Sequence, residues 1–219
     1  MGTNVYIDGF NLYYGSLRKT TFKWLDLSKL CELLLPDRKI NKIRYFTAKV
    51  RELPHDQQAP IRQATYLRAL GTTPIVTIHK SRFTQRPRVY PQFPLAYVPD
   101  RKPYKRPPLN VQILRAEEKE SDVNLATYLL LDCLNNDFID AVVITNDGDL
   151  RLPIEMVWSI FGKWVGIINP HKKYRLNRKL ASVARVLVQE INKSVLAEAQ
   201  FPSTLTDSYG TITKPPEWD

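Results

Sequence analysis

Residues 141–150 read AVVITNDGDL, an apolar run that ends in a polar turn with two aspartates. The run predicts a β-strand, and Asp147 and Asp149 leave it with only Gly148 between them. Residues 4–11, NVYIDGFN, repeat this arrangement, because Asp8 ends an apolar run and is followed by a glycine. Ligands of open parallel sheets collect beyond the carboxyl ends of the strands. We therefore expect these acids to lie at one edge of a sheet.

Short β-rich runs alternate with segments of helical spacing along the chain. The expected strands are Asn4–Asp8, Ile43–Ala48, Ile75–His79, Ala141–Thr145 and Val165–Ile168. The expected helices are Leu27–Leu34, Ile61–Leu70, Val123–Leu134, Pro153–Phe161 and Leu176–Ile191. This alternation predicts the α/β class, with a parallel sheet flanked by helices on both faces. We expect a single domain over residues 1–195 and a C-terminal tail over 196–219, which packs along the surface or stays mobile.

Residues 80–108 hold much of the positive charge in this sequence. The segment contains eight Lys or Arg and one acid, so it carries seven of the ten net positive charges. Its seven prolines forbid a helix or a central strand and predict an extended surface insertion without regular structure. Cations meet phosphates and aromatic rings stack on unpaired bases, so we expect binding to single-stranded nucleic acid. The expected contact residues are Arg82, Arg86, Arg88, Arg101, Lys102, Lys105, Arg106, Tyr90, Tyr97 and Tyr104. A solvated loop without a ligand is the alternative.

Several other classes of protein do not suit this sequence. No apolar run is long enough for a membrane span, and residues 1–10 do not resemble a secretory signal, so we expect a cytoplasmic protein with no membrane partner. Cys31 and Cys133 form neither a disulfide framework nor a zinc set, and buried reduced thiols are expected. There is no GxGxxG or GxxxxGK[ST] motif, which argues against dinucleotide and P-loop chemistry. The three histidines sit in unrelated settings, so we expect surface or strand-end roles for them.

A third source of carboxylates is the segment EEKESDVNLATYLLLDCLNND, residues 117–137. Asp122 falls in the first turn of the expected helix, where the helix dipole favours a carboxylate whether or not it binds metal. Asp132 follows ten residues later, about 15 Å further along the helix, and is expected to be structural or to support the site indirectly. Carboxylate oxygens are the ligands that Mg²⁺ and Mn²⁺ prefer.

The ordered set YIDGFNLY, EEKESDVNLA and VVITNDGDL, followed by WVGIINP, resembles the NYN domains of the PIN-like nuclease superfamily, including LabA-like proteins. The resemblance runs from residue 4 to about residue 170. It implies a PIN-like, Rossmann-like fold and a metal-dependent ribonuclease activity with Mg²⁺ or Mn²⁺ and RNA as the substrate. Matched to the family's motifs, the catalytic residues are Asp8, Asn11, Asp122, Asp147 and Asp149, and the four acids of this set are the expected metal ligands. PIN-like domains often dimerise, so a homodimer or a protein partner is a further expectation by analogy.

The sequence departs from the family at Tyr128, where members often have another acid, and this puts a second metal site in doubt. Other polar residues are expected to support the acids through hydrogen bonds or by steadying charge. These supporting residues are Lys119, Ser121, Asp132, Thr145 and Asn146.

Two other functions compete with the ribonuclease. A phosphatase of the HAD type uses an Asp-x-Asp pair like that of residues 147–149, but on its first strand, where this chain has Phe10 in place of the second acid. A non-catalytic RNA-binding module or partner subunit would need only the basic insertion, with the acids stabilising loops. The two are separated by assays on phosphomonoesters and by alanine variants of the acids.

Overall fold

A computed structural model of the chain describes residues 1–52, 56–93, 109–171, 174–184 and 188–219. Its centre is a seven-stranded sheet in the order β4-β3-β2-β1-β5-β6-β7, within which only the β3–β4 pair is antiparallel. The strands are β1 (Thr3–Asp8), β2 (Ile40–Ala48), β3 (Val76–Pro91), β4 (Asn110–Lys119), β5 (Asp140–Ile144), β6 (Trp164–Asn169) and β7 (Val188–Glu190). The expected α/β fold with a mostly parallel sheet is confirmed.

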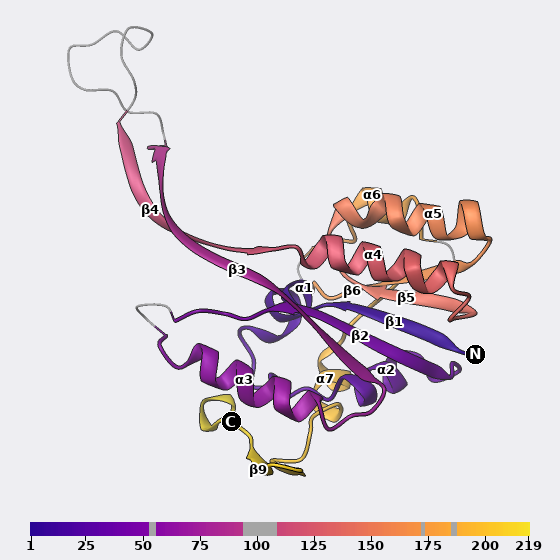
Figure 1. Cartoon of the computed structure of the whole chain (residues 1–219), viewed down its shortest axis with the longest axis horizontal. Helices are drawn as coiled ribbons and strands as arrows, with labels where there is room; N and C mark the ends of the chain where they lie inside the picture. Colours follow the sequence, from indigo (N-terminus) through magenta and orange to yellow (C-terminus); the bar gives the residue numbers. More distant parts are fainter. Residues whose placement is uncertain (53–55, 94–108, 172–173, 185–187) are drawn as a thin grey trace, which may run out of the picture.

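Helices cover both faces of this sheet (Figure 1). On one face lie α4 (Ser121–Leu134), α5 (Arg151–Phe161) and the short α6 (Arg178–Ala181). On the other face lie α2 (Leu27–Leu34), α3 (Ala59–Leu70) and α7 (Lys193–Glu198). Each face has its own apolar cluster, and the strand alternation of β1 sends Ile7 into one cluster and Tyr6 into the other. No helix within the described ranges is both long and apolar enough to cross a membrane.

Successive strands are added to the sheet on opposite sides of β1. From β1 the chain adds β2 and β3 on one side, then returns to add β5, β6 and β7 on the other. The carboxyl ends of β1 and β5 therefore flank a topological switch point, where the diverging connections leave room for a ligand. After β1 the chain enters α1 (Gly9–Leu12) and a π-helical turn, η1 (Tyr13–Leu17). After β5 it enters the 3₁₀ turn η3 (Gly148–Leu150).

The basic insertion differs from the expectation of an irregular loop. Residues 82–91 of β3 pair with residues 110–119 of β4 in an unbroken antiparallel register, and this two-stranded ribbon extends from the sheet (Figure 1). We call it the arm. Pro87 and Pro91 are compatible with it because each arm strand has a single partner, so one edge needs no ladder hydrogen bond. Of the expected contact residues, Tyr97, Arg101, Lys102, Tyr104, Lys105 and Arg106 lie outside the described residues.

Residues 176–219 also differ in part from what the sequence predicts. The helix expected over Leu176–Ile191 is wrong, because the described residues there form the four-residue α6 and then strand β7. Residues 196–219 contain the hairpin β8 (Thr204–Asp207) with β9 (Gly210–Thr213), and the 3₁₀ turn η4 (Pro216–Trp218). Ile212 and Trp218 are buried in the same cluster as α2 and α3. These residues therefore contribute to the core.

Candidate active site

The structure brings the four expected acids to the carboxyl edge of the sheet. Asp8 ends β1, and Asp147 follows β5 and caps η3, in which Asp149 lies. Asp122 reaches the same edge from the first turn of α4. The acids come from both sides of the switch point, so a ligand in that crevice meets all three segments.

Asp8 is the most constrained of these acids. Its side chain is almost fully buried, and its Oδ1 accepts a hydrogen bond from the Asn11 backbone N–H at 2.9 Å. Its Oδ2 accepts from Asn11 Nδ2 at 2.6 Å and from the Thr145 hydroxyl at 3.2 Å. Burial raises the pKa of Asp8, these hydrogen bonds lower it, and the charge of Asp147 raises it further. The carboxylate is therefore fixed in position.

Asp147 is held by the loop that leaves β5. Its backbone N–H donates to the Thr145 hydroxyl at 3.1 Å, and its Oδ1 accepts from the Asp149 N–H at 3.0 Å. Thr145 thus connects Asp8 to Asp147, because its hydroxyl also donates to Asp8. Asn146 links the loop to its surroundings: its N–H donates to Asn11 Oδ1 at 3.3 Å, and its Oδ1 accepts from the Asn177 N–H at 2.7 Å.

The pKa of Asp122 responds to the neighbouring acids. Although the residue is exposed overall, its pKa is raised to about 6, first by partial desolvation of its carboxylate and then by the charges of Asp8, Asp147, Glu118 and Asp149. A group of carboxylates with this mutual repulsion favours a divalent cation, which would relieve it. The electrostatics of the edge therefore fit Mg²⁺ or Mn²⁺, as does the all-oxygen donor set.

The acids share this neighbourhood without forming a preassembled metal cage. Across the described ranges, no three His, Cys, Asp or Glu side chains stand together in a group that could hold a metal ion as it is. Asp122 is exposed, and the side chain of Asp149 is 84% exposed, with Lys179 Nζ 3.8 Å from its Oδ1.

Two of the residues expected to support the site have other partners in the structure. Asp132 is buried under the sheet, where it accepts a hydrogen bond from the Tyr6 hydroxyl at 2.7 Å and pairs with Arg44 through Nε at 2.6 Å and Nη2 at 2.7 Å. It cannot replace the acid that the family often has at position 128, because Arg44 occupies both of its oxygens. Tyr128 itself packs under Arg44, with the guanidinium carbon 4.6 Å from the ring centre. Lys119 lies at the base of the arm, with its Nζ 3.9 Å from Glu117.

Glu118 and Ser81 lie at the edge of the candidate site, and the sequence did not predict a role for them there. Glu118 accepts hydrogen bonds from the Ser121 N–H at 2.8 Å and the Ser81 hydroxyl at 2.9 Å, which fixes the start of α4 and with it Asp122. The buried Ser121, one of the expected supporting residues, also shares a hydroxyl contact of 2.7 Å with Ser81. Glu118 could have been suspected from the sequence, because a polar side chain three residues before the start of a helix can accept a hydrogen bond from a free N–H of its first turn.

His171 is a further residue that reasoning from the sequence placed only at a strand end. Its Nε2 lies 3.2 Å from Asn11 Oδ1, which must be an acceptor because Asn11 donates its amide N–H to Asp8. Burial lowers the pKa of His171, so the neutral Nε2–H tautomer fits this contact. The segment WVGIINPH that follows β5 could have indicated it, because β6 ends at the same edge of the sheet.

Comparison with known proteins shows the family of this chain. The family model described as the NYN domain matches residues 2–184. The chain belongs to the NYN domain family. The matched range includes all three motifs on which the resemblance rests, and the mixed α/β fold agrees with a PIN-like domain.

Two similar proteins complete the comparison of this NYN domain. The chain is 32% identical over 99% of its length to "6-hydroxy-3-succinoylpyridine 3-monooxygenase HspA" of Pseudomonas putida (strain DSM 28022 / S16), and it covers 75% of that protein. A crystal structure of a protein of unknown function from Vibrio parahaemolyticus RIMD 2210633 superposes with a TM-score of 0.51, covering 87% of this chain and 93% of that one. At 14% identity, the second likeness shows the fold alone.

Proposed function

We propose that this NYN protein is a metal-dependent ribonuclease that hydrolyses phosphodiester bonds of single-stranded RNA with Mg²⁺ or Mn²⁺. One observation carries the proposal: Asp8, Asp122 and Asp147 lie at the same edge of the sheet, where desolvation first and the charges of Asp8 and Asp147 second raise the pKa of Asp122 to about 6. A site with a purely structural purpose gains nothing from that repulsion. A phosphodiester hydrolase uses it to bind its metal.

In this proposal Asp8, Asp122 and Asp147 hold the metal, with Asp149 completing the set when its exposed side chain turns inward. A bound divalent cation lowers the pKa of its water and stabilises the charge that develops on the phosphodiester. The chain's own contribution is positioning. Asn11 and Thr145 hold both oxygens of Asp8, and the Thr145 hydroxyl couples that carboxylate to the Asp147 loop.

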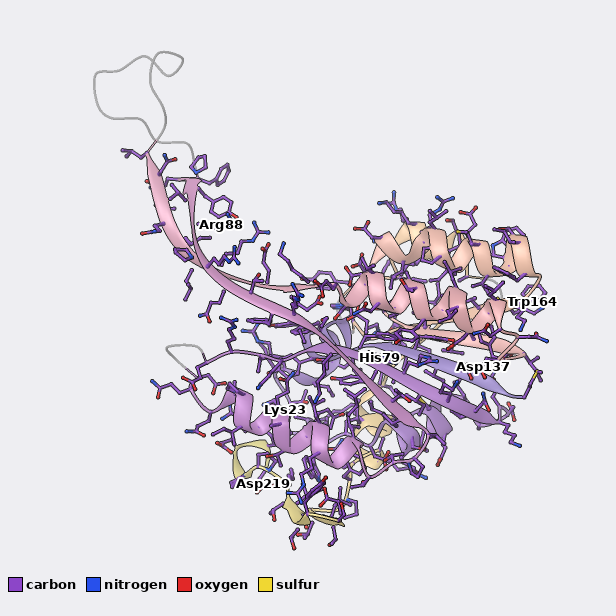
Figure 2. The ribbon with its side chains drawn as sticks, viewed as in Figure 1. Lys23, His79, Arg88, Asp137, Trp164 and Asp219 are labelled. Atoms are coloured by element: carbon purple, nitrogen blue, oxygen red, sulfur yellow. The ribbon has the colours of Figure 1, made fainter. Side chains whose placement is uncertain are left out.

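The arm supplies a surface for the RNA backbone. Directly paired residues of an antiparallel ribbon point to the same side, and alternate residues point to opposite sides. The register pairs Arg82 with Lys119, Arg86 with Arg115 and Arg88 with Ile113, so five cations share one side. The same side carries one acid, Glu117, which pairs with Thr84 in the register and forms salt bridges with Arg115 and Lys119. Tyr90 is on that side too, with the Arg115 guanidinium carbon 5.7 Å from its ring centre. Figure 2 shows Arg88 on the arm, away from the two helix layers.

The other side of the arm has a different character. It carries Pro87 opposite Leu114 and Val89 opposite Gln112, with no cation between positions 83 and 91 of β3 on that side. The arm is therefore two-sided, and its basic side is the one that complements a polyanion.

We expect the double variant Arg86→Gln/Arg88→Gln to weaken binding of single-stranded RNA and to reduce the slope of log affinity against log salt by about one to two, because each phosphate contact adds about 0.7 to that slope. Fluorescence anisotropy of a labelled oligonucleotide over a salt series measures it. Lys39→Gln/Lys193→Gln removes two exposed charges from the body and should leave the slope unchanged. Equal slopes for the two double variants would exclude the arm as the RNA surface.

The test of the proposed activity is cleavage of labelled single-stranded RNA and DNA by the purified protein with Mn²⁺, with Mg²⁺ and with EDTA. We expect RNA cleavage that needs the metal and that is lost in Asp147→Asn, whose amide oxygen can still cap η3. Asp37→Asn, which changes an exposed aspartate far along the sequence from the motifs, serves as the matched control. Metal binding and RNA binding without cleavage would favour the non-catalytic module instead.

A second candidate function follows from the relative in Pseudomonas putida, whose name gives it an oxygenase activity on a substituted pyridine. The similarity extends over almost the whole chain, which is the observation that favours this candidate. A monooxygenase consumes dioxygen and two electrons per substrate. Oxygen uptake with 6-hydroxy-3-succinoylpyridine and reduced nicotinamide as the electron donor tests it, and no uptake above a protein-free blank would exclude it for this substrate.

A further inference from the structure

A cavity of about 390 Å³ lies beside the acid edge, on the face of the sheet that α3 covers. We call it the ring pocket. Its walls come from α1 and η1, from α3, from the end of β2, from Phe83 at the base of the arm, and from Trp218. This volume is in the range of small-molecule sites. Gly9 and Phe10, which line it, follow Asp8 directly in the chain, so part of its wall is adjacent to the proposed catalytic edge, although none of the four acids lines it.

Several aromatic rings line this pocket, and those of Tyr13 and Tyr14 belong to exposed residues. Phe10 stacks almost parallel to Tyr14, with ring centres 6.2 Å apart, and almost parallel to Phe83 at 6.4 Å. Tyr14 is nevertheless 55% exposed, and Tyr13 packs edge-on against it with ring centres 5.3 Å apart. Exposed tyrosine rings at a cavity mouth offer a planar ligand a surface for stacking. The π-helical turn that carries Tyr13 and Tyr14 is a rare element, which is frequent at functional sites.

The charges of the ring pocket favour an anion. Its lining contains four cations and two acids. Both acids, Asp56 and Glu217, are used by Arg62, whose Nη2 is 2.5 Å from Asp56 and whose Nη1 is 3.2 Å from Glu217. The other three cations form no salt bridge within the described residues, and they are Arg18, Lys23 and Arg51. Arg18 instead lies over the Tyr14 ring, with its guanidinium carbon 5.3 Å from the ring centre.

From these observations we propose that the ring pocket binds a planar heteroaromatic ring that carries an anionic group, with the ring packed against the exposed pair Tyr13 and Tyr14 and the anion beside Arg18. Two kinds of ligand have this chemistry, and for the first of them, a nucleotide of RNA, the inference rests on the proposed ribonuclease function and deepens it. In a ribonuclease, the ligand is the nucleotide next to the scissile bond, whose base enters the pocket and whose phosphate meets the cations. A free heteroaromatic carboxylate has the same chemistry and is the other source.

The test is equilibrium binding to the whole chain in EDTA, so that the acid edge and its metal play no part. The probes are 5′-UMP, 5′-AMP and pyridine-3-carboxylate, followed by isothermal titration calorimetry. We expect saturable binding of at least one probe, weakened about tenfold by Tyr14→Ala and by Arg18→Gln, because stacking and cation–anion contacts are each of that size. Tyr14→Phe, which keeps the ring, should bind like the unchanged protein.

Matched controls change the same residue types elsewhere. Tyr209→Ala alters a tyrosine that is 89% exposed in the β8–β9 turn, and Lys19→Gln alters an exposed cation next to Arg18 that does not line the pocket. Neither should change the binding. Nucleotide binding assigns the pocket to RNA, and binding of pyridine-3-carboxylate alone assigns it to a free acid. No saturable binding of any probe, or the same loss in the controls, overturns the inference.

This outcome is separable from that of the proposed function. Metal-dependent RNA cleavage without binding of any probe would overturn the ring pocket and leave the ribonuclease. Binding of a probe by a protein that cuts no RNA would support the pocket and reject the ribonuclease.

Discussion

Asp122→Asn is expected to reduce metal-dependent RNA cleavage by at least about a hundredfold, because loss of a metal ligand exceeds the 10- to 100-fold effects of outer hydrogen-bonding partners. The variant is nearly isosteric, and Asp122 is exposed at the first turn of α4, so the fold should be preserved. Single-turnover cleavage in Mn²⁺ measures the effect, with circular dichroism as the folding control. Undiminished cleavage would remove Asp122 from the proposed metal set.

The same variant should make the metal-free protein more stable, which is the opposite of its effect on activity. The pKa of Asp122 is raised from 3.8 to about 6, so the charged carboxylate destabilises the folded state. That penalty is absent below pH 3.8, grows between pH 3.8 and 6, and is complete above pH 6. Because Asp122 is exposed, we discount the shift for solvent screening and expect a gain of about 1 kcal/mol at pH 7.5.

Urea unfolding in EDTA at pH 7.5 and at pH 3.5 checks this sign. The stability difference between Asp122→Asn and the unchanged protein should be present at pH 7.5 and vanish at pH 3.5. A variant that is less stable at pH 7.5 would show that the carboxylate has a favourable partner and that the acids do not repel one another.

Asp132→Ala should destabilise the protein by about 3–5 kcal/mol, the usual result of removing one partner of a buried ion pair. The side chains of Arg44 and Asp132 are only 12% and 5% exposed, and the Tyr6 hydroxyl would lose its acceptor as well. Thermal or urea unfolding measures the loss. Glu155→Ala, which breaks the exposed pair with Arg151, is the matched control and should change stability by less than about 1 kcal/mol.

The Asp132→Ala variant also tests whether Asp132 belongs to the metal site. Because Asp132 binds Arg44 and not the acid edge, the folded fraction of Asp132→Ala should keep its Mn²⁺ affinity. A large loss of Mn²⁺ affinity, measured at a temperature where the variant is folded, would return Asp132 to the metal site.

The positions of Asp8 and Asp147 were predictable from the sequence because they depend on local pattern. Each follows a short apolar run, and parallel strands end at a common edge, so two such runs are enough to bring their acids together. Asp122 was harder, since a first-turn acid is equally explained by the helix dipole. Its raised pKa depends first on its desolvation and then on its distances to the other acids, and both are properties of the three-dimensional structure.

The arm, β7 and the ion pair of Asp132 were not predictable, and the reason is the same for all three. Each depends on partners far away in the sequence: residues 82–91 on residues 110–119, the three residues of β7 on β6, and Asp132 on Arg44. Proline-rich and very short segments give no periodic signal of their own. Their structure is decided by the neighbour that accepts their hydrogen bonds.

The arm also divides the protein into regions of unequal local stability. Among the described residues, no apolar layer packs on this two-stranded ribbon, as the exposed Val89 and Leu114 show, so we expect its backbone amides to open by fraying without global unfolding. The amides of β1 and β5, buried at the centre of the sheet, exchange their hydrogens with solvent only when the domain unfolds. Binding of a polyanion to the arm should therefore slow hydrogen exchange of the arm's backbone amides. Deuterium uptake along β3 would then locate the bound ligand without any cleavage of RNA.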